Sequence, residues 1–535
     1  MNGAGYILAF LKEKKIGTVF AYPGSSVLPL YAALCGSGIR VVLSRHEQGA
    51  AHEAVGYAKA TGLPGVVVAT SGPGATNLVT GIADAYLDSA PLLVITGQVA
   101  SGAIGRDAFQ EADIMGITIP VTKHNYLIKK SDDLPSALEE AYRVATFPRM
   151  GPVLVDITGD VFDAEIPAAA THFECLLPRH HQNDFRLRQA SLDVRAALEK
   201  AEKPLLLVGG GVAAAGASAE LRTVAREYHI PVVTTMMGRA IGAGDGFPEL
   251  VGMAGVYGTR EANEALADCD LLLAIGTRFS DRTVPDAAAL ERGRTIVHAD
   301  PDSAELAKNV RADICVCCGA VRMFEMLRTV LADLPEEKKK CFAAFAAKHT
   351  ATSRESGVCG TLCEVLAAYE AGHPGTRVVT DVGLAQTALA RGLALREERA
   401  YVTSGGLGAM GFGLPAAIGA AYALADTGRS NPAVRVITVA GDGGFQMTAH
   451  ELPLVRHTPV PVKAIVIDNA SLGMVAELPQ GRGGLYDLAD NPDFVVLAAA
   501  YGVPAEVLPE GDPRLESRLG AFLASPGSGL FIIKS

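Results

Sequence analysis

Short apolar runs alternate with longer, alanine-rich segments along almost the whole chain, and this alternation limits the possible folds more than any other feature. In the first third the runs are TVFAY, VVLS, GVVVATS, PLLVITG and PVLVDIT. Strands buried on both faces read as continuous apolar runs, and parallel strands are joined by helical crossovers. The pattern therefore predicts an α/β protein built on parallel sheets.

The alternation falls into three blocks, which we expect to be three doubly wound parallel-sheet domains at residues 1–166, 189–335 and 357–535. A length of 535 residues agrees with this division, since domains average about 150 residues. A polar connection near 167–188 is a predicted linker, and so is the charged segment near 336–356, which we expect to be a helix with a polar tail. The outer blocks share a layout, which permits an old duplication.

Charge and cysteine content exclude several classes of protein. The chain carries 47 basic and 58 acidic side chains, so it has no basic surplus to neutralise nucleic acid or anionic lipid. Nine irregularly spaced cysteines are typical of a reducing cytoplasm rather than of a disulfide framework. Zinc binding at Cys315, Cys317 and Cys318 stays open, although no second cysteine pair lies at a zinc-finger distance.

Two apolar segments resemble, at first sight, a signal peptide and a membrane-spanning helix. The amino-terminal MNGAGYILAFLKEKK has no basic leader, and we expect an amphipathic helix rather than a signal peptide. Residues 404–425 carry no charge and are long enough to cross a bilayer, but they are rich in Gly and Ala. We predict a tightly packed helix and loop there, explained either by a subunit interface or by burial within one chain.

The strongest chemical signal is GDGG at 441–444, directly after the run VRVITVA, followed by Asp468 and Asn469 after VKAIVID. Ligands of open α/β sheets bind at the carboxyl ends of the strands, so Asp442 and Asn469 can reach one point. Carboxylate and amide oxygens suit Mg²⁺ or Ca²⁺, and glycines let backbone N–H groups approach a phosphate. Alone, GDGG would be read as a turn. The spacing favours a diphosphate–metal site.

The second signal is Glu47, which follows VVLS in SRHEQGAAHEAVGYAKATG, ahead of VVVATSGPGATN. In isolation it would be a helix first-turn acid favoured by the helix dipole. Together with the GDGG segment it resembles the cofactor site of thiamine diphosphate (ThDP) enzymes. Over nearly its whole length the chain is similar to the catalytic large subunit of acetolactate (acetohydroxyacid) synthase. The matching segments are VFAYPGSSVLPLYAAL, RHEQGAAHEAVGYAKATG, TSGPGATN, DAFQEADIMGITIPVTKH, SGGLGAMGFGLPAAIGA and GDGGFQMTAHEL.

The resemblance implies a role for each block. The first block would bind the pyrimidine of ThDP, the third its diphosphate with Mg²⁺, and the central Rossmann-like block a structural FAD. Glu47 would promote the imino tautomer of the cofactor, the Gly408 carbonyl would accept its amino group, and Met410 would support its bent conformation. The metal ligands would be Asp442, Asn469 and the backbone of Ser471. Further implied cofactor-binding residues are Pro23, Gly24, Gly72, Gly383, Gly441, Gly443, Gly444 and Met474 for ThDP, and Gly209, Gly210, Gly211, Asp281, Arg282 and Asp300 for the central block.

Substrate residues also follow from the resemblance. Phe109, Gln110 and His124 would line the substrate side, and Arg278 would receive the carboxylate of a second 2-keto acid through its planar guanidinium. Outside the family context each has an ordinary interpretation: His124 as a structural histidine, Arg278 as a surface ion pair, and Met410 as core.

Four departures from the family pattern bear on function. Asp468 stands where the family has Asn, and Leu384 and Ala385 replace two polar phosphate contacts, each worth about 1–3 kcal/mol. Leu478 replaces the Trp that shapes the acceptor pocket, and the chain contains no Trp. The sequence stops at GLFIIKS, before the carboxyl-terminal extension of typical members, so we expect a less closed site.

The resemblance implies decarboxylation of pyruvate and carboligation to a second 2-keto acid, giving 2-acetolactate, in branched-chain amino acid or acetoin-type metabolism. Two alternatives stay open: a related ThDP-dependent decarboxylase or carboligase with another 2-keto acid, and a cofactor-binding paralogue that scaffolds a true synthase. It also implies a homodimer or homotetramer with active sites between subunits, and leaves a small regulatory subunit possible.

Overall fold

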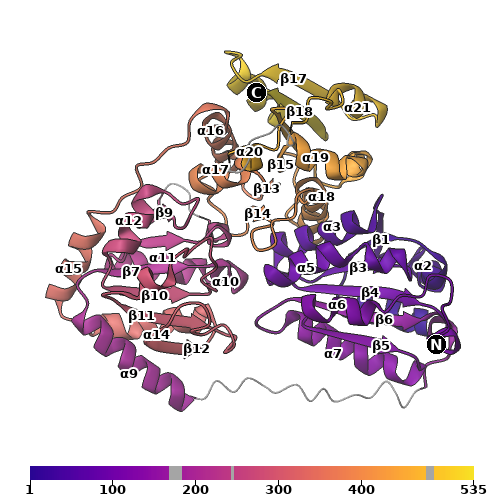
Figure 1. Ribbon diagram of the computed structural model, residues 1–535, viewed down its shortest axis with the longest axis horizontal. Helices are drawn as coiled ribbons and strands as arrows, with labels where there is room; N and C mark the ends of the chain where they lie inside the picture. Colours follow the sequence, from indigo (N-terminus) through magenta and orange to yellow (C-terminus); the bar gives the residue numbers. More distant parts are fainter. Residues whose placement is uncertain (168–183, 243–245, 478–486) are drawn as a thin grey trace. The chain divides into compact units, whose positions relative to one another are not determined.

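The computed structural model describes residues 1–167, 184–242, 246–477 and 487–535, and contains three six-stranded parallel sheets (Figure 1). The α/β fold class expected from the alternating runs is therefore confirmed. The chain forms two compact units, each described by itself: Met1–Pro178 with Gly375–Ala385 and Val402–Ser535, and Arg179–Pro374 with Gln386–Tyr401. The domain boundaries given above remain predictions, and the linker near 167–188 falls largely outside the described residues.

The amino-terminal sheet has the strand order β2-β1-β3-β4-β6-β5. Its strands are β1 (Thr18–Tyr22), β2 (Arg40–Leu43), β3 (Gly65–Ala69), β4 (Leu92–Gln98), β5 (His124–Ile128) and β6 (Pro152–Thr158). Its helices are α1 (Gly3–Glu13), α2 (Leu28–Leu34), α3 (Glu47–Thr61), α4 (Pro73–Thr76), α5 (Val79–Leu87), α6 (Ile114–Thr118), α7 (Leu134–Thr146) and α8 (Gly159–Asp163). The amino-terminal segment is thus helical, as expected.

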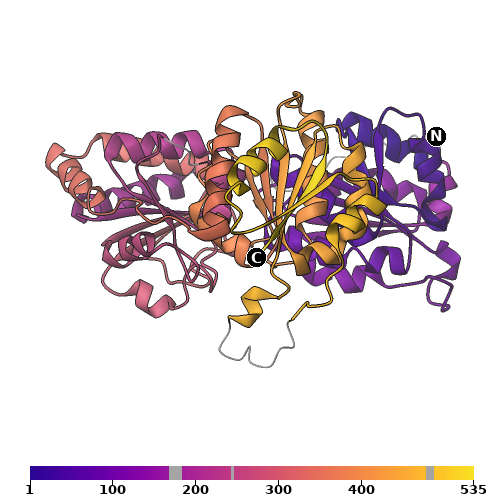
Figure 2. The same ribbon diagram turned by 90° about the horizontal axis from the view of Figure 1, so that it is seen from above.

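The carboxyl-terminal sheet has the order β14-β13-β15-β16-β18-β17, and helices cover both of its faces (Figure 2). Its strands are β13 (Arg377–Thr380), β14 (Tyr401–Thr403), β15 (Val436–Gly441), β16 (Val462–Asp468), β17 (Ala505–Pro509) and β18 (Gly529–Lys534). Its helices are α18 (Gly413–Asp426), α19 (Asp442–Thr448), α20 (Gly473–Ala476), α21 (Phe494–Ala500) and α22 (Leu515–Ala524). Numbered along the chain, this order equals that of the amino-terminal sheet, so the shared layout is confirmed.

The central sheet has a different order, β12-β11-β10-β7-β8-β9. Its strands are β7 (Pro204–Val208), β8 (Val232–Thr234), β9 (Leu250–Met253), β10 (Leu271–Ile275), β11 (Thr295–Asp300) and β12 (Ile314–Cys317). Helices of this unit are α9 (Asp184–Lys200), α10 (Gly210–Ala214), α11 (Ser218–Tyr228), α12 (Arg260–Asp268), α13 (Ala287–Glu291), α14 (Ala320–Ala332), α15 (Glu336–Ala346) and α16 (Gly357–Gly372), while α17 (Leu384–Gly392) begins in the first unit and belongs to this one from Gln386 on. Read from β9, the sheet has the 3-2-1-4-5-6 order of dinucleotide-binding folds.

Helices α3 and α18 pack directly against each other and join the first and third sheets within one unit (Figure 1). Small residues permit this approach: a Cβ at Gly419 would overlap the Glu53 carbonyl, and one at Gly56 would overlap the Ala416 carbonyl. The helix and loop predicted for residues 404–425 are present, and burial within one chain accounts for their composition. Among the described residues, no helix is both long and apolar enough to cross a membrane.

Candidate functional site

Glu47 is the first residue of α3, at the carboxyl end of β2, as predicted. Its side chain is buried, and its Oε2 accepts a hydrogen bond from Asn77 Nδ2 at 3.0 Å. A Cβ placed on Gly74 would lie 3.4 Å from Glu47 Oε1, so the carboxylate faces the short helix α4. The helix N-terminus favours negative charge at this position. Asn77 is a functional candidate that sequence reasoning missed, although it lies inside the matched segment TSGPGATN.

Three other predicted residues gather near the ends of β1 and β3. Gly72 has φ +58°, and a Cβ there would lie 2.8 Å from the Gln110 carbonyl oxygen. Gly24 lies so close to Thr70 that it has no room for a side chain. Gln110 itself has φ +61°, a strained value for a residue with a side chain, and strain of this kind is common in functional loops. The structure thus brings Gly24, Gly72 and Gln110 to the sheet edge that carries Glu47.

His124 lies elsewhere. It is the exposed first residue of β5, with its ring centroid 4.6 Å from that of Tyr126. Because the sheet is parallel, the start of β5 lies at the opposite edge from Glu47. Within one chain the structure does not bring His124 to Glu47, and its substrate role stays a prediction. Phe109, in contrast, is 88 % exposed in the loop that contains Gln110.

The predicted diphosphate side is built by the ends of β15 and β16. Asp442 begins α19; its Oδ1 accepts the Gly443 N–H at 2.9 Å, and burial, together with the nearby charge of Asp468, raises its pKa. Asn469 is exposed directly after β16, and its Oδ1 accepts the Ser471 N–H at 3.2 Å. Both side chains thus follow the strand ends at which the sequence placed them.

Two residues that sequence reasoning missed complete this cluster. Asn491 Nδ2 donates to Asp442 Oδ2 at 2.7 Å and to Asp468 Oδ1 at 3.0 Å, so it bridges both carboxylates. Lys534 forms an ion pair with Asp468 Oδ2. The strand register could have found Lys534, because it lies directly opposite Asp468 in the β16–β18 ladder. The additional negative charge at position 468 is therefore balanced by this chain's own cation.

The residues present fit a diphosphate and a hard cation. Asp442, Asn469 and the Ser471 carbonyl offer the oxygen ligands that Mg²⁺ prefers. A Cβ placed at Gly383, Gly408 or Gly441 would meet no described atom within 4 Å, so the backbone beside each of them is open to a ligand. A Cβ at Gly443 would lie 3.5 Å from Met410 Cε, which brings Met410 to the GDGG turn.

Leu384 lies in this cluster as well, next to the residues that would hold the metal. A Cβ on Gly473 would lie 2.7 Å from Leu384 Cδ1 and 3.3 Å from Asn469 Nδ2. The polar-to-apolar departure at this position is therefore located beside Asn469 and the residue preceding Met474. Leu478, the departure expected at the acceptor pocket, lies outside the described residues.

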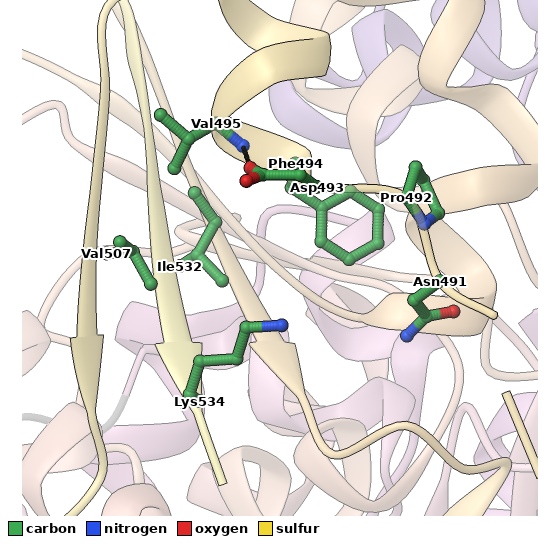
Figure 3. Close-up of a pocket in the computed structure, with 8 residues that line it drawn as sticks. All are labelled: Asn491, Pro492, Asp493, Phe494, Val495, Val507, Ile532 and Lys534. Atoms are coloured by element: carbon green, nitrogen blue, oxygen red, sulfur yellow. Dashed lines mark hydrogen bonds between the residues drawn. The ribbon is translucent and has the colours of Figure 1, made fainter. Parts of the chain in front are cut away.

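A cavity of about 280 Å³ adjoins the Asp442 cluster (Figure 3). Phe494, Val507 and Ile532 give it apolar walls, while Asn491 and Lys534 supply polar groups. In Figure 3 the ammonium of Lys534 points to the side on which Asn491 lies. Asn491 and Lys534 also contact Asp468, so the cavity lies beside the predicted diphosphate side.

Two buried carboxylates hold the segments next to the candidate residues. Asp381 accepts the N–H groups of Gly411 at 3.0 Å and Gly413 at 2.8 Å, after the loop that carries Met410, and burial raises the pKa of Asp381 to about 6. Glu451 accepts the N–H groups of Arg45, at 3.0 and 2.9 Å, and of His46, at 3.0 Å. These two residues directly precede Glu47, so Glu451 fixes the start of α3.

In the central unit, a glycine turn lies at the switch point between β7 and β10. Gly209 donates its N–H to the Ile275 carbonyl and Gly211 donates to the Gly276 carbonyl, both across adjacent strands. A Cβ at Gly211 would lie 2.8 Å from the Gly276 Cα, so the two turns require glycine. Dinucleotide sites are found at such switch points. The predicted strand, glycine turn and helix start are confirmed.

Arg278 follows β10 in this same unit. The preceding Thr277 carbonyl is 2.8 Å from His298 Nε2, while His298 Nδ1 accepts the Ala307 N–H at 3.3 Å. Since Nδ1 is an acceptor, Nε2 carries the proton and donates to Thr277. His298 is buried and thus fixes the loop that presents Arg278. Asp281 and Arg282 are exposed in the same loop, and Asp300 ends β11.

The cysteine cluster lies at an edge of this sheet. Cys315 and Cys317 are exposed in β12, and Cys318 is buried directly after it. In the described part of the chain, no three His, Cys, Asp or Glu residues are grouped so that they could hold a metal ion.

Comparisons with known proteins agree with this architecture. Three family models match in succession: the N-terminal TPP binding domain, the central domain and the C-terminal TPP binding domain of thiamine pyrophosphate enzymes, at residues 1–117, 193–327 and 381–533. Thiamine pyrophosphate is another name for ThDP. The fold and the two strand-end clusters therefore define a ThDP enzyme.

Relatives narrow the class. A probable acetolactate synthase large subunit of Methanocaldococcus jannaschii is 39% identical, over 98% of this chain and 90% of its own length. The acetolactate synthase large subunit of Lactococcus lactis is 40% identical, over 94% and 87%, and isozyme 2 large subunit of Escherichia coli is 38% identical, over 98% and 94%. The chain belongs to the acetolactate synthase large-subunit family of ThDP enzymes.

Proposed function

We propose that this enzyme decarboxylates pyruvate and joins the two-carbon product to a second 2-keto acid, giving 2-acetolactate, with ThDP and Mg²⁺. The route would be branched-chain amino acid or acetoin-type metabolism. The main support is the retention of both halves of a ThDP site: Glu47, buried at the start of α3, and Asp442 with Asn469 at adjacent strand ends. The full-length relatives are named acetolactate synthases.

Each residue has a defined task in this proposal. Bound ThDP supplies a nucleophilic carbon and an electron sink for decarboxylation. Glu47 shares a proton with the ring nitrogen of the aminopyrimidine, and Asn77, donating to Oε2, orients the carboxyl. Asp442, Asn469 and the Ser471 carbonyl hold Mg²⁺, while Pro23, Gly24, Gly72, Gly383, Gly408, Gly441, Gly443, Gly444, Met410 and Met474 surround the cofactor.

The substrates are held by side chains. Arg278 binds the carboxylate of the second keto acid, since a guanidinium donates two parallel hydrogen bonds to a carboxylate. His298, through the Thr277 carbonyl, keeps the Arg278 loop in place. Phe109, Gln110 and His124 complete the substrate side. The exposure of Phe109 supports contribution of this loop to a site shared between subunits.

The central domain binds FAD as a structural cofactor in this proposal. Its strand order and the glycine turn at the β7–β10 switch point support a dinucleotide ligand. The residues assigned to it are Gly209, Gly210, Gly211, Asp281, Arg282 and Asp300. Cofactor extraction from the purified protein, followed by absorbance and mass spectrometry, tests this assignment.

We further propose a cytoplasmic homodimer or homotetramer that works with a small regulatory subunit. The relatives are named large subunits, which supports a smaller partner. The free thiols of the described cysteines support a reducing compartment. Sedimentation or light scattering of the purified chain, alone and with a candidate small subunit, measures the assembly.

The product assay tests the activity. Purified enzyme with pyruvate, ThDP and Mg²⁺ should form acetolactate, and Glu47→Gln should lower kcat/KM by roughly 100-fold or more, since such proton transfers contribute at least that much. Glu516→Gln is the matched control, because Glu516 is also a first-turn acid, on α22, but is exposed. Release of CO₂ or acetaldehyde without acetolactate contradicts the carboligase.

A related ThDP enzyme with another 2-keto acid is the second candidate, favoured by Leu478, which stands where the family has the Trp that shapes the acceptor pocket. A panel of keto acids with products identified by mass spectrometry separates the two functions. Tight ThDP binding without turnover of any keto acid, in both the native enzyme and Glu47→Gln, would instead indicate a scaffold.

A further inference from the structure

The loop at 403–412, which carries Gly408 and Met410, is held by side chains from the amino-terminal sheet's helices. Lys59 of α3 donates from Nζ to the Thr403 carbonyl at 2.8 Å. Asp88, directly after α5, accepts the Gly405 N–H at 3.1 Å. These contacts connect residues more than 300 positions apart within one compact unit.

Ser404 forms two further hydrogen bonds that hold the same loop. Its hydroxyl donates to Asp84 Oδ1, and its Oγ accepts the Ala409 N–H at 2.9 Å. A Cβ on Gly406 would lie 2.5 Å from Asp88 Oδ1, so the loop lies directly on the end of α5. The hydrogen bond to Ala409 closes the loop around Gly408, whose carbonyl is assigned to the cofactor.

The three charged side chains form one buried cluster. Lys59 Nζ lies 2.6 Å from Asp88 Oδ2 and 3.4 Å from Asp84 Oδ2, and the side chains are 9%, 1% and 0% exposed. Burial acts to lower the pKa of Lys59, but the two carboxylates outweigh it and raise the pKa. Lys59 also lies 4.7 Å from the centre of the Phe412 ring, at the far end of the loop.

Stability alone does not explain such a cluster. Buried ion pairs are often no more stabilising than apolar residues of similar size, because both charges lose their hydration. This cluster, however, also binds the backbone at Thr403 and Gly405 and, through Ser404, at Ala409. Those are the groups that decide where Gly408 and Met410 lie.

We propose that Lys59, Asp84 and Asp88 are positioning residues that order the 403–412 loop for cofactor binding. The proposal rests on the proposed function, because it takes Gly408 and Met410 as ThDP contacts. A loop ordered beforehand binds its ligand more tightly, since the entropy of ordering is not lost on binding. Asp381 holds the loop's far side at Gly411 and Gly413, and the cluster holds its near side.

Two variants separate this role from a general structural one. Ser404→Ala removes the hydrogen bonds that join Ser404 to Asp84 and Ala409, and leaves all three charges of the cluster in place. Lys59→Met combined with Asp88→Asn removes one positive and one negative charge, so the net charge of the cluster is unchanged. The control is Ser528→Ala: like Ser404, Ser528 donates one hydrogen bond and accepts one, here to the Val455 carbonyl and from the Val462 N–H, but at the opposite end of the sheet.

The measurements are hydrogen exchange of the peptide spanning 404–412 in cofactor-free protein, calorimetric Kd for ThDP with Mg²⁺, melting temperature, and kcat at saturating ThDP. Both loop variants should speed exchange in this peptide about tenfold, with other peptides unchanged, and raise the ThDP Kd about tenfold. The kcat should change less than threefold, because bound cofactor orders the loop. Ser528→Ala should leave peptide exchange and Kd as in the native protein.

The proposal is overturned if Ser404→Ala changes neither loop exchange nor Kd by more than twofold. It is also overturned if exchange rises throughout the unit in proportion to a lower melting temperature. Hydrogen exchange and the ThDP Kd can both be measured without turnover. A native enzyme that binds ThDP but forms no acetolactate would therefore contradict the proposed activity and leave the positioning role standing. A native enzyme that binds no ThDP contradicts both.

Discussion

Two loops occupy the same place in two sheets of the same strand order, and they are secured differently. The β2–α3 loop at 44–46 leads to Glu47, and the β14–α18 loop at 403–412 carries Gly408 and Met410. Glu451, from the carboxyl-terminal domain, holds the first loop by its backbone N–H groups. A charged cluster on α3 and α5 holds the second. Each domain thus fixes the other's loop within one chain.

The difference lies in charge compensation. The second loop is bound by two carboxylates that share the cation of Lys59. Glu451 instead lies close to another buried acid, Glu53, and burial raises the pKa of both carboxyls. Burial raises the pKa of Asp88 as well, but there the charge of Lys59 opposes the shift. The same topological position therefore carries an attachment that includes a cation in one sheet and an attachment beside a second acid in the other.

Disrupting the contact between α3 and α18, the helices that follow the two loops, should have the largest effect on the free energy of unfolding. A Cβ at Gly419 of α18 would overlap the Glu53 carbonyl of α3, and neither backbone can move without the other. Gly419→Ala should lower the free energy of unfolding by about 3 kcal/mol, at the upper end of overpacking costs. Denaturant unfolding measures it.

The matched control is Gly520→Ala in α22, where a Cβ would meet no described atom within 4 Å. It should stabilise by about 0.5–1 kcal/mol, because alanine loses less backbone entropy in a helix. Equal effects of the two substitutions would show that the α3–α18 contact is not tight.

Removing Glu451, which holds the first loop, should have the second-largest effect on the free energy of unfolding. Glu451→Ala removes the acceptor of the N–H groups of Arg45 and His46, and each such hydrogen bond contributes about 0.5–1.5 kcal/mol. We expect a loss of about 2 kcal/mol in unfolding free energy and a roughly tenfold lower kcat, because Glu47 follows directly. Unfolding curves and kcat at saturating ThDP are the measurements; unchanged kcat would refute the positioning of Glu47 by this carboxylate.

Glu451→Gln sharpens the comparison through pH. The raised pKa of the Glu451 carboxyl means that the folded state binds its proton more tightly than the unfolded chain does. Its contribution to stability is therefore full below the ordinary value of 4.5 and falls as pH rises through the raised pKa. Glu451→Gln should flatten the decline of unfolding free energy above pH 4.5, and an identical pH profile would contradict it. Asp88→Asn, in the compensated loop, should flatten it less.

The sequence allowed prediction of what lies close along the chain. Strand runs followed by Asp442, Asn469 and Glu47 placed these residues at strand or helix ends, because local periodicity carries that information. The sequence did not predict that Lys59 and Asp88 hold the loop at Gly405. It also did not predict that Glu451 binds the backbone at Arg45, since these contacts join segments hundreds of residues apart.

Topology explains the remaining differences. Which strand end a residue occupies depends on the sheet as a whole, so His124, at the start of an edge strand, could not be placed relative to Glu47 from its sequence position. Asn491 had no motif around it, and only the folded chain brings it to Asp442 and Asp468. Small residues signalled close packing at 404–425, while α3 as the partner became visible only in three dimensions.

The starts of the strands, at the end of each sheet opposite the two loops, allow the prediction with the smallest effect on stability and the strongest dependence on pH. The second residue of β4 is Leu93, whereas the second residue of β16 is Lys463, almost fully buried, with Nζ donating to Ser525 Oγ at 2.8 Å. Burial, helped by the charge of Arg435, lowers the pKa of Lys463 from 10.5 to about 8.

Because the unfolded chain binds this proton more tightly, the penalty is full below pH 8 and disappears as pH rises to 10.5. Lys463→Met keeps the length of the side chain and removes the charge, so it should raise the unfolding free energy by about 1–2 kcal/mol at pH 7. The gain should shrink between pH 8 and pH 10. Lys12→Met, at an exposed position, should stay within about 0.5 kcal/mol at every pH. A gain that does not depend on pH would mean that packing, and not the buried charge, distinguishes the two sheets at this end.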